Sequence, residues 1–167
     1  MREKIEADAV YKTMQSPVGT LVLLASERGL HAVNWVEERI VQAEGFKPDP
    51  EYPLLVETQK QLEEYFASQR KIFELPLAPR GTPFQLQIWK LLLDIPFGQT
   101  ATYGELAVLA GDVNASRAVG MANNRNPIAI IVPCHRVIGR SGALVGFGGG
   151  LMNKSLLLDL ESQFRLF

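Results

Sequence analysis

The sequence predicts an α+β protein with a strand-rich N-terminal part and a mainly helical C-terminal part. Three short runs of β-favouring residues, separated by turn signals, open the chain. Apolar residues at helical spacing, with capping residues before them, dominate the second half. A change from alternating strands to punctuated helices is typical of α+β architecture.

The predicted strands are Val10–Met14, Thr20–Ser26 and Leu30–Val36. A turn signal at Pro17–Gly19 and another at Arg28-Gly29 separate them, so we expect an antiparallel sheet. A helix is predicted next, over Pro53–Phe66, because its apolar residues recur at helical spacing with charges between them.

A proline-containing stretch separates the two parts. Pro76 and Pro79 lie close together before the first C-terminal helix signal. We therefore expect a supporting domain at residues 1–76, a linker at 77–80 and a second domain at 81–167.

The second part contains three predicted helices. Thr82-Pro83-Phe84-Gln85 provides an N-cap, a proline at the first helical position and a capping-box glutamine, and Pro96-Phe97-Gly98 ends that helix. Thr102-Tyr103-Gly104-Glu105 is a second capping box that opens a helix to Ala110. Asn114 is the expected N-cap of a third helix at 115–123. Two short helices across a glycine-containing turn fit a helix-turn-helix, although ordinary helical hairpins have the same pattern.

The end of the chain combines an apolar run, a glycine-rich loop and a helix. Ile128–Val132 is expected to be a buried strand or an extended run that leads into a site. Gly142–Gly150 lacks the spacing of a phosphate-binding loop, so its glycines indicate flexibility or close approach of the backbone to a ligand. A closing helix is predicted over Leu151–Glu161.

Composition excludes several kinds of protein. The chain has 167 residues, 47% of them hydrophobic, which fits one or two globular domains. One cysteine and two histidines exclude an internal disulfide and argue against a zinc site, so we expect no metal and no cofactor. The charged N-terminus does not resemble a signal peptide, and no apolar run approaches the length of a membrane span. We expect a soluble, cytoplasmic protein without a membrane partner.

The net charge of −1 conceals an asymmetry. Residues 1–80 carry 10 Lys and Arg against 13 Asp and Glu, whereas residues 81–167 carry 7 against 5. The segment 113–140 contains four arginines and no acidic residue. This cluster is either an ordinary solvated face or a surface for an anionic ligand such as nucleic acid.

Cys134 and His135 form the candidate reactive centre. A lone cysteine at the end of an apolar run is often buried and inert. However, a cationic neighbour lowers the pKa of a thiol, and His135 and Arg136 provide such neighbours. A catalytic histidine also needs a third group to orient it, and the later carboxylates Asp159 and Glu161 are both candidates.

Several motifs resemble the O6-alkylguanine-DNA alkyltransferase family, also called the methylated-DNA–protein-cysteine methyltransferases. The likeness covers roughly residues 81–161, in the family's order and spacing, and a weaker match begins at Ser16-Pro17-Val18-Gly19. The motifs are Gly81-Thr82-Pro83-Phe84-Gln85 followed by Trp89, Pro96-Phe97-Gly98 followed by Thr102-Tyr103-Gly104, Ser116-Arg117-Ala118-Val119-Gly120, Asn126-Pro127, Pro133-Cys134-His135-Arg136-Val137-Ile138-Gly139, and Gly149-Gly150 before Lys154.

The resemblance implies a fold, an activity and a partner. The N-terminal domain would be ribonuclease H-like, and the second domain would be a winged helix-turn-helix. The activity would be DNA repair by direct reversal: an alkyl group moves from O6-alkylguanine, and in some members O4-alkylthymine, in double-stranded DNA to the protein's own cysteine. The protein would act as a monomer, and each molecule would react once.

The resemblance also implies roles for residues. Cys134 would be the acceptor, and His135 would take its proton through a bridging water, oriented by Glu161. Tyr103 and Lys154 would donate toward the base. Asn126 would brace the helix-turn-helix against the active-site strand. The expected DNA contacts are Arg117, which would replace the flipped nucleotide in the stack, and Ala115, Ser116, Ala118, Gly120, Met121, Asn123, Arg125 and Arg136. The expected pocket residues are Pro133, Val137, Phe147, Gly148 and Gly149.

The sequence departs from the family at three positions. Phe147 stands where many members have tyrosine, Gly148 where some have serine, and Asn123 where some have an apolar residue. The glycines at 148–150 are compatible with alkyl groups larger than methyl.

Two other function classes are weighed against repair. One is a DNA lesion sensor without chemistry, although such relatives replace the cysteine that this chain keeps. The other is a cysteine hydrolase, which would turn over repeatedly.

Overall fold

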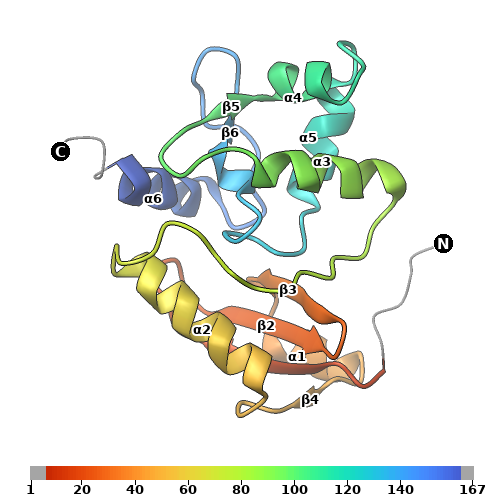
Figure 1. Ribbon diagram of the computed structural model, residues 1–167, viewed down its shortest axis with the longest axis vertical. Helices are drawn as coiled ribbons and strands as arrows, with labels where there is room; N and C mark the ends of the chain where they lie inside the picture. Colours follow the sequence, from red (N-terminus) through yellow and green to blue (C-terminus); the bar gives the residue numbers. More distant parts are fainter. Residues whose placement is uncertain (1–6, 163–167) are drawn as a thin grey trace. The chain divides into compact units, whose positions relative to one another are not determined.

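The computed structural model describes residues 7–162 and divides the chain into two compact units, Met1–Arg80 and Gly81–Phe167 (Figure 1). The first unit contains a four-stranded sheet with two helices, and the second is mainly helical with one two-stranded pair. The α+β class predicted from the sequence is confirmed. Within residues 7–162, no helix is long and apolar enough to cross a membrane.

The sheet of the first unit has the strand order β3-β2-β1-β4. β1 (Val10–Met14), β2 (Leu21–Ser26) and β3 (Gly29–Asn34) are antiparallel neighbours, as predicted. The fourth strand, β4 (Lys47–Pro48), pairs parallel with β1, so the sheet is mixed and the prediction of a purely antiparallel sheet is wrong. Two residues carry no periodicity, which is why the sequence did not indicate this strand.

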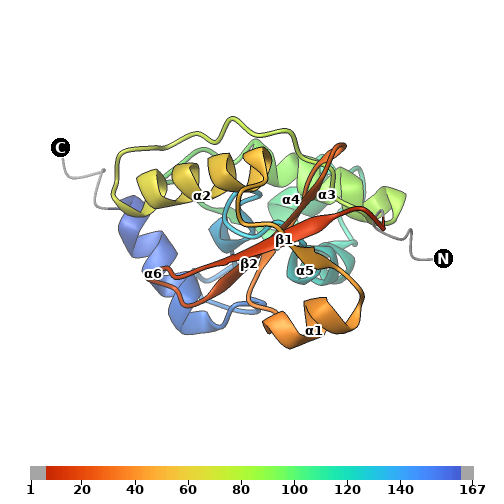
Figure 2. The same ribbon diagram turned by 90° about the horizontal axis from the view of Figure 1, so that it is seen from below.

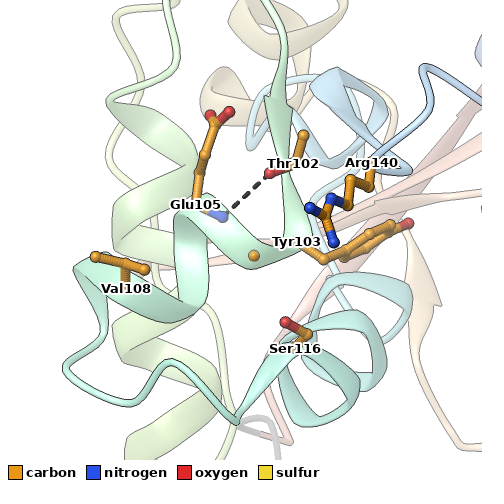
Figure 3. A pocket seen from close by; sticks show the side chains of 7 residues that line it. Thr102, Tyr103, Glu105, Val108, Ser116 and Arg140 are labelled. Carbon is orange, nitrogen blue, oxygen red and sulfur yellow. Dashed lines mark hydrogen bonds between the residues drawn. The ribbon is translucent and has the colours of Figure 1, made fainter.

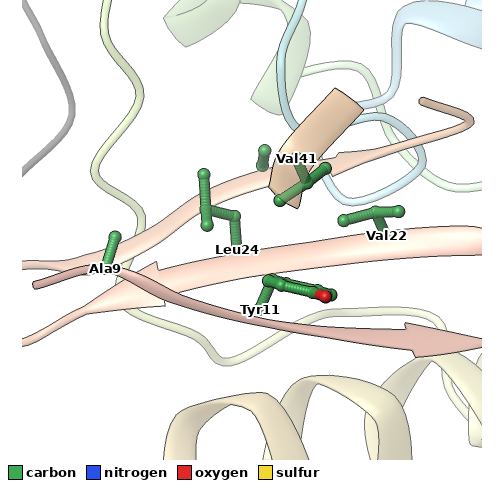
Figure 4. Close-up of a cluster of buried hydrophobic side chains, with 6 residues drawn as sticks. Ala9, Tyr11, Val22, Leu24 and Val41 are labelled. Carbon is green, nitrogen blue, oxygen red and sulfur yellow. The ribbon is translucent and has the colours of Figure 1, made fainter. Parts of the chain in front are cut away.

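Both faces of this sheet are covered by helices (Figures 1 and 2). The side chains of Tyr11, Val22 and Leu24 form a buried cluster with Val41 of α1 (Glu38–Ala43), a short helix that the sequence did not predict (Figure 4). The opposite face packs against α2 (Pro53–Phe66), whose predicted bounds are confirmed. Coverage on both sides explains why every residue of β2 is buried and apolar alternation is absent there.

The stretch before the second unit is bound to the edge strand β3. The N–H of Leu30 donates to the Pro76 carbonyl at 2.8 Å, and the N–H of Ala78 donates to the Leu30 carbonyl at 2.8 Å. Gly29 has a φ of 138°, and a Cβ there would lie 2.7 Å from the Pro76 oxygen. Glycine is therefore required for this close approach.

In the second unit, α3 (Pro83–Leu93) begins at the predicted capping box. The Thr82 side chain accepts from the Gln85 N–H, and the Gln85 side chain accepts from the Thr82 N–H. The buried Trp89 of this helix donates its indole N–H to the Ala122 carbonyl at 2.8 Å. A Cβ on Gly81 would meet the Trp89 ring at 2.6 Å, so the glycine permits this packing.

Two short helices, α4 (Tyr103–Leu109) and α5 (Ser116–Asn124), pack against each other and against α3. Thr102 caps α4 by accepting from the Glu105 N–H at 3.1 Å, as predicted, but the return bond of the predicted capping box does not occur among residues 7–162. The N-cap of α5 is Ala115 and not Asn114. Asn114 lies in the preceding turn, where its N–H donates to the side chain of Asp112.

The buried segment 128–132 is a turn, so the predicted strand is wrong. Ile130 has a φ of 73°, and the N–H groups of Ile131 and Val132 bond locally to Ala129 and Ile128. A left-handed β-branched residue costs about 1–3 kcal/mol, which the surrounding structure must offset. The turn leads into a single 3-10 turn, η1 (Cys134–Arg136). The chain closes with α6 (Leu151–Ser162).

Candidate active site

The turn before the cysteine is held by the side chain of Asn126. Its Nδ2 donates to the Val132 carbonyl at 2.8 Å and to the Ile128 carbonyl at 3.4 Å, and its Oδ1 accepts from the Ile128 N–H at 3.0 Å. These bonds close the loop on itself, which overrides the β propensity of the isoleucines. Asn126 therefore fixes the path of the chain into η1, where the thiol lies.

η1 is itself held between two other elements. It packs against α3 and α6. Directly after it, β6 (Val137–Ile138) pairs in parallel with β5 (Ala101–Thr102). Cys134 is thus fixed by a turn on one side and a strand pair on the other, and only 4% of its surface is exposed.

His135 and Glu161 form a buried pair beside the cysteine. His135 Nε2 lies 2.6 Å from Glu161 Oε2, and both side chains are almost fully buried. The sequence left Asp159 and Glu161 open as partners, and Asp159 is exposed. Because an ionised carboxylate only accepts hydrogen bonds, the hydrogen must be on His135 Nε2. His135 Nδ1 therefore carries the lone pair, and it has no hydrogen-bond partner within residues 7–162.

Burial controls the acid–base state of this group. It raises the pKa of the Cys134 thiol to about 11, although a hydrogen bond with Asn126 and the charge of Lys154 act in the opposite direction. Burial likewise lowers the pKa of His135, against the influence of Glu161. Burial opposes ionisation of Glu161, but its bonds to His135 and Arg136 win and lower its pKa to about 2. At neutral pH the site therefore holds a thiol, a neutral imidazole and a carboxylate.

Tyr103 and Lys154 converge on one carbonyl of the glycine-rich loop. The Tyr103 hydroxyl donates to the Val145 oxygen at 2.9 Å, and Lys154 Nζ donates to the same oxygen at 3.0 Å. Burial raises the pKa of Tyr103 and lowers the pKa of Lys154, and the Cys134 thiolate would raise both. Two donors from α4 and α6 thus lie on either side of one loop.

Two residues predicted to contact DNA lie in the interior instead. Arg136 is 6% exposed and forms an ion pair with Glu161. Asn123 is 1% exposed, and its Nδ2 donates to the Cys134 carbonyl at 3.3 Å. Both expectations are wrong: Arg136 lies in η1, where all three residues are buried, and Asn123 faces inward from α5, which also carries exposed side chains. Their burial depends on tertiary packing, which the sequence pattern did not reveal.

The other predicted contacts are divided between an exposed face and partly buried positions. Arg117, Ala118, Met121 and Arg125 are exposed on α5 or at its end. Ala115, Ser116 and Gly120 are partly buried, and a Cβ on Gly120 would lie 3.7 Å from the Tyr103 ring. Of the expected pocket residues, Pro133 and Val137 are buried, Phe147 and Gly149 are half-buried, and Gly148 is exposed.

A pocket of about 610 Å³ opens where α4 and α5 begin (Figure 3). Cys134 is not among its lining residues, but Tyr103 is. Arg140 extends over it near Tyr103, and Ser116 lies on the α5 side. Arg140 is one of the four arginines of the segment 113–140, and the sequence does not assign Thr102, Glu105 or Val108 to a site. Their lining position arises from the packing of α4 against α5.

Comparisons with known proteins match both units of the chain. The family described as "6-O-methylguanine DNA methyltransferase, DNA binding domain" matches residues 83–163. Its ribonuclease-like domain matches residues 9–79. A methylated-DNA–protein-cysteine methyltransferase of Methanosarcina acetivorans is 48% identical over 155 residues, covering 92% of this chain and 98% of the relative.

Solved structures agree. The crystal structure of the Mycobacterium tuberculosis O6-methylguanine methyltransferase matches with a TM-score of 0.86 and 44% identity, over 93% of both chains. The structure of Mycobacterium tuberculosis OGT in complex with DNA matches with a TM-score of 0.83 and 46% identity, over 92% of both chains. The chain therefore belongs to the 6-O-methylguanine DNA methyltransferase family.

Proposed function

We propose that this protein repairs DNA by moving a methyl or other alkyl group from O6-alkylguanine in duplex DNA to the sulfur of Cys134. The observation that carries the proposal is the buried His135–Glu161 pair next to the only cysteine, with His135 Nδ1 left as the bare base. The family relationship and the DNA complex of a relative support DNA as the partner. The protein acts on it as a monomer.

The thiol must lose its proton to become a nucleophile. His135 Nδ1 accepts that proton through a bridging water, and Glu161 stabilises the resulting imidazolium. Sulfur then displaces the guanine oxygen at the alkyl carbon: the C–S bond forms, the C–O bond breaks, and its electron pair leaves with the guanine. The product thioether is a poor leaving group, so Cys134 is not regenerated.

The developing negative charge on the guanine requires hydrogen-bond donors. Tyr103 and Lys154 are two donors at the glycine-rich loop, and both donate to the Val145 carbonyl. In the complex, Tyr103 donates to the base ring and Lys154 acts on the O6 side. Pro133, Val137, Phe147, Gly148 and Gly149 form the walls of the base pocket.

The target atom lies inside the base stack, so the nucleotide must be flipped out at a cost of a few kcal/mol. The exposed α5 residues Arg117, Ala118 and Met121 approach the minor groove, where the small side chain of Ala118 permits close contact. Arg117 fills the space left by the flipped nucleotide. Arg125 neutralises backbone phosphate, and recognition does not depend on base sequence because minor-groove readout is degenerate.

The two parts of the chain divide the work. Residues 81–167 bind DNA and carry the transfer chemistry, residues 1–76 support this domain, and residues 77–80 join the two. No group of three or more His, Cys, Asp and Glu side chains that could hold a metal ion occurs within residues 7–162.

The proposal is tested by incubating the protein with a duplex that contains one O6-methylguanine, followed by mass analysis of the peptide that carries Cys134. We expect one added methyl group on Cys134 and none in a Cys134→Ser variant. Duplex binding without any mass change would instead indicate a lesion sensor. Continued product release beyond one equivalent would indicate a hydrolase.

A further inference from the structure

Arg136 is buried and makes contacts that are all inside the protein. Its Nε donates to Glu161 Oε1 at 2.8 Å, and its Nη2 donates to Glu161 Oε2 at 3.2 Å. Its Nη1 donates to the Ile95 carbonyl at 2.7 Å, and the guanidinium lies 5.7 Å from the centre of the Phe97 ring. A bidentate, permanently charged partner of this kind fixes both the position and the charge of a carboxylate.

Glu161 is therefore shared among His135, Arg136 and the backbone of Gly98. Its Oε2 accepts from His135 and Arg136, while its Oε1 accepts from Arg136 and from the N–H of Gly98 at 3.2 Å. The negative charge that could stabilise an imidazolium is already partly neutralised by a cation. Sharing makes the carboxylate a well-fixed orienting group for His135, and it reduces, without removing, the electrostatic support that Glu161 gives to the imidazolium.

The charged groups that act on His135 come from two elements. Glu161 and Lys154 belong to α6, and Arg136 belongs to η1 with Cys134. Of these, Glu161 favours the protonated imidazole, whereas Arg136 and Lys154 disfavour it. The charge that lowers the pKa of Cys134 is that of Lys154. Arg136 contacts Glu161, which in turn contacts His135. Its influence on the thiol passes through Glu161 and His135.

We propose that Arg136 is a positioning residue that holds Glu161 in place while restraining the basicity of His135, so that Cys134 remains a thiol until an alkylated base is docked. This inference rests on the proposed function. Because each protein molecule reacts only once, every unwanted alkylation of Cys134 inactivates one molecule. The imidazole is aligned by Glu161 in the resting protein, but it is too weak a base to generate a standing thiolate.

The test compares Arg136→Met with Arg136→Lys, which keeps the charge. Loss of a like charge within a few ångströms shifts a pKa by roughly one unit or more, so His135 in Arg136→Met should titrate about one pH unit higher by NMR. A one-unit rise makes the thiolate–imidazolium pair about tenfold more populated, and the Cys134 reaction with iodoacetamide at neutral pH should accelerate accordingly. Arg136→Lys should stay near the wild type on both measurements.

An unchanged His135 titration and unchanged iodoacetamide rate in folded Arg136→Met would overturn the proposal. If Arg136→Met does not fold, the wild type decides: His135 must titrate below its ordinary value of 6.5, and a value above 7 would overturn it. Neither readout uses DNA. If the titration and iodoacetamide results are as expected but no methyl group is transferred, only the repair function is contradicted. If methyl transfer is normal but Arg136→Met leaves the His135 titration unchanged, only the role of Arg136 is contradicted.

Discussion

Replacing Asn126 with alanine should destabilise the second unit, because its side chain forms three of the hydrogen bonds that close the turn leading to the thiol. The variant loses two well-formed hydrogen bonds, at 2.8 and 3.0 Å, and a weaker one at 3.4 Å. Each is worth about 0.5–1.5 kcal/mol, and a buried group left unpaired costs more. The strained Ile130, with its φ of 73°, also loses its restraint. We expect a loss of about 2–4 kcal/mol in unfolding free energy.

Urea denaturation followed by circular dichroism measures this loss, and thermal melting should show a fall of roughly 10–20 °C for a unit of this size. Asn114→Ala is the matched control, because Asn114 is exposed and only its backbone N–H forms a bond in the turn. That control should change stability by less than about 0.5 kcal/mol. A loss below about 1 kcal/mol for Asn126→Ala would refute the reasoning that this side chain holds the turn.

Three further predictions follow from the site and the helix that supports it. Arg117→Ala should slow repair in duplex DNA by about tenfold or more, because the variant loses part of the few kcal/mol that offset flipping, yet react normally with free O6-benzylguanine; equal losses on both substrates would contradict the role. The free energy of unfolding should fall as the pH drops below 6.5, because His135 binds a proton more readily in the unfolded chain than in the folded protein. It should fall again below about pH 4.5, because Glu161 is then neutralised. A urea midpoint that stays constant between pH 7 and pH 5 would exclude the contribution of His135. Thr82→Ala should cost about 1 kcal/mol in urea, against almost nothing for the exposed Thr100→Ala.

Local signals predicted the helices well. The bounds of α2 follow from its apolar spacing, and α3 begins at Thr82 because the capping box is encoded within four residues. Short elements escaped prediction: α1 has six residues and β4 has two, which is too short for a repeating apolar pattern to stand out. Their existence depends on packing against β1 and the sheet.

The site was predictable where a motif carries the chemistry and unpredictable where packing decides. Cys134 and His135 stand next to each other in the chain, but the choice of Glu161 over Asp159 depends on which side of α6 faces inward. Arginine is a residue type that commonly contacts DNA, so a DNA contact was expected for Arg136. Only the tertiary structure places its side chain against Glu161. The run 128–132 has the propensity of a strand, but the side chain of Asn126 turns it back on itself.

The central claim is that Cys134 is consumed once in accepting an alkyl group. The most direct measurement is a titration of a fixed amount of protein with increasing O6-methylguanine duplex, counting repaired bases by chromatography of the digested DNA. The account predicts a plateau at one repaired base per protein molecule, matched by one methyl group on Cys134. Repair that continues beyond one equivalent, or that proceeds in the Cys134→Ser variant, would contradict it.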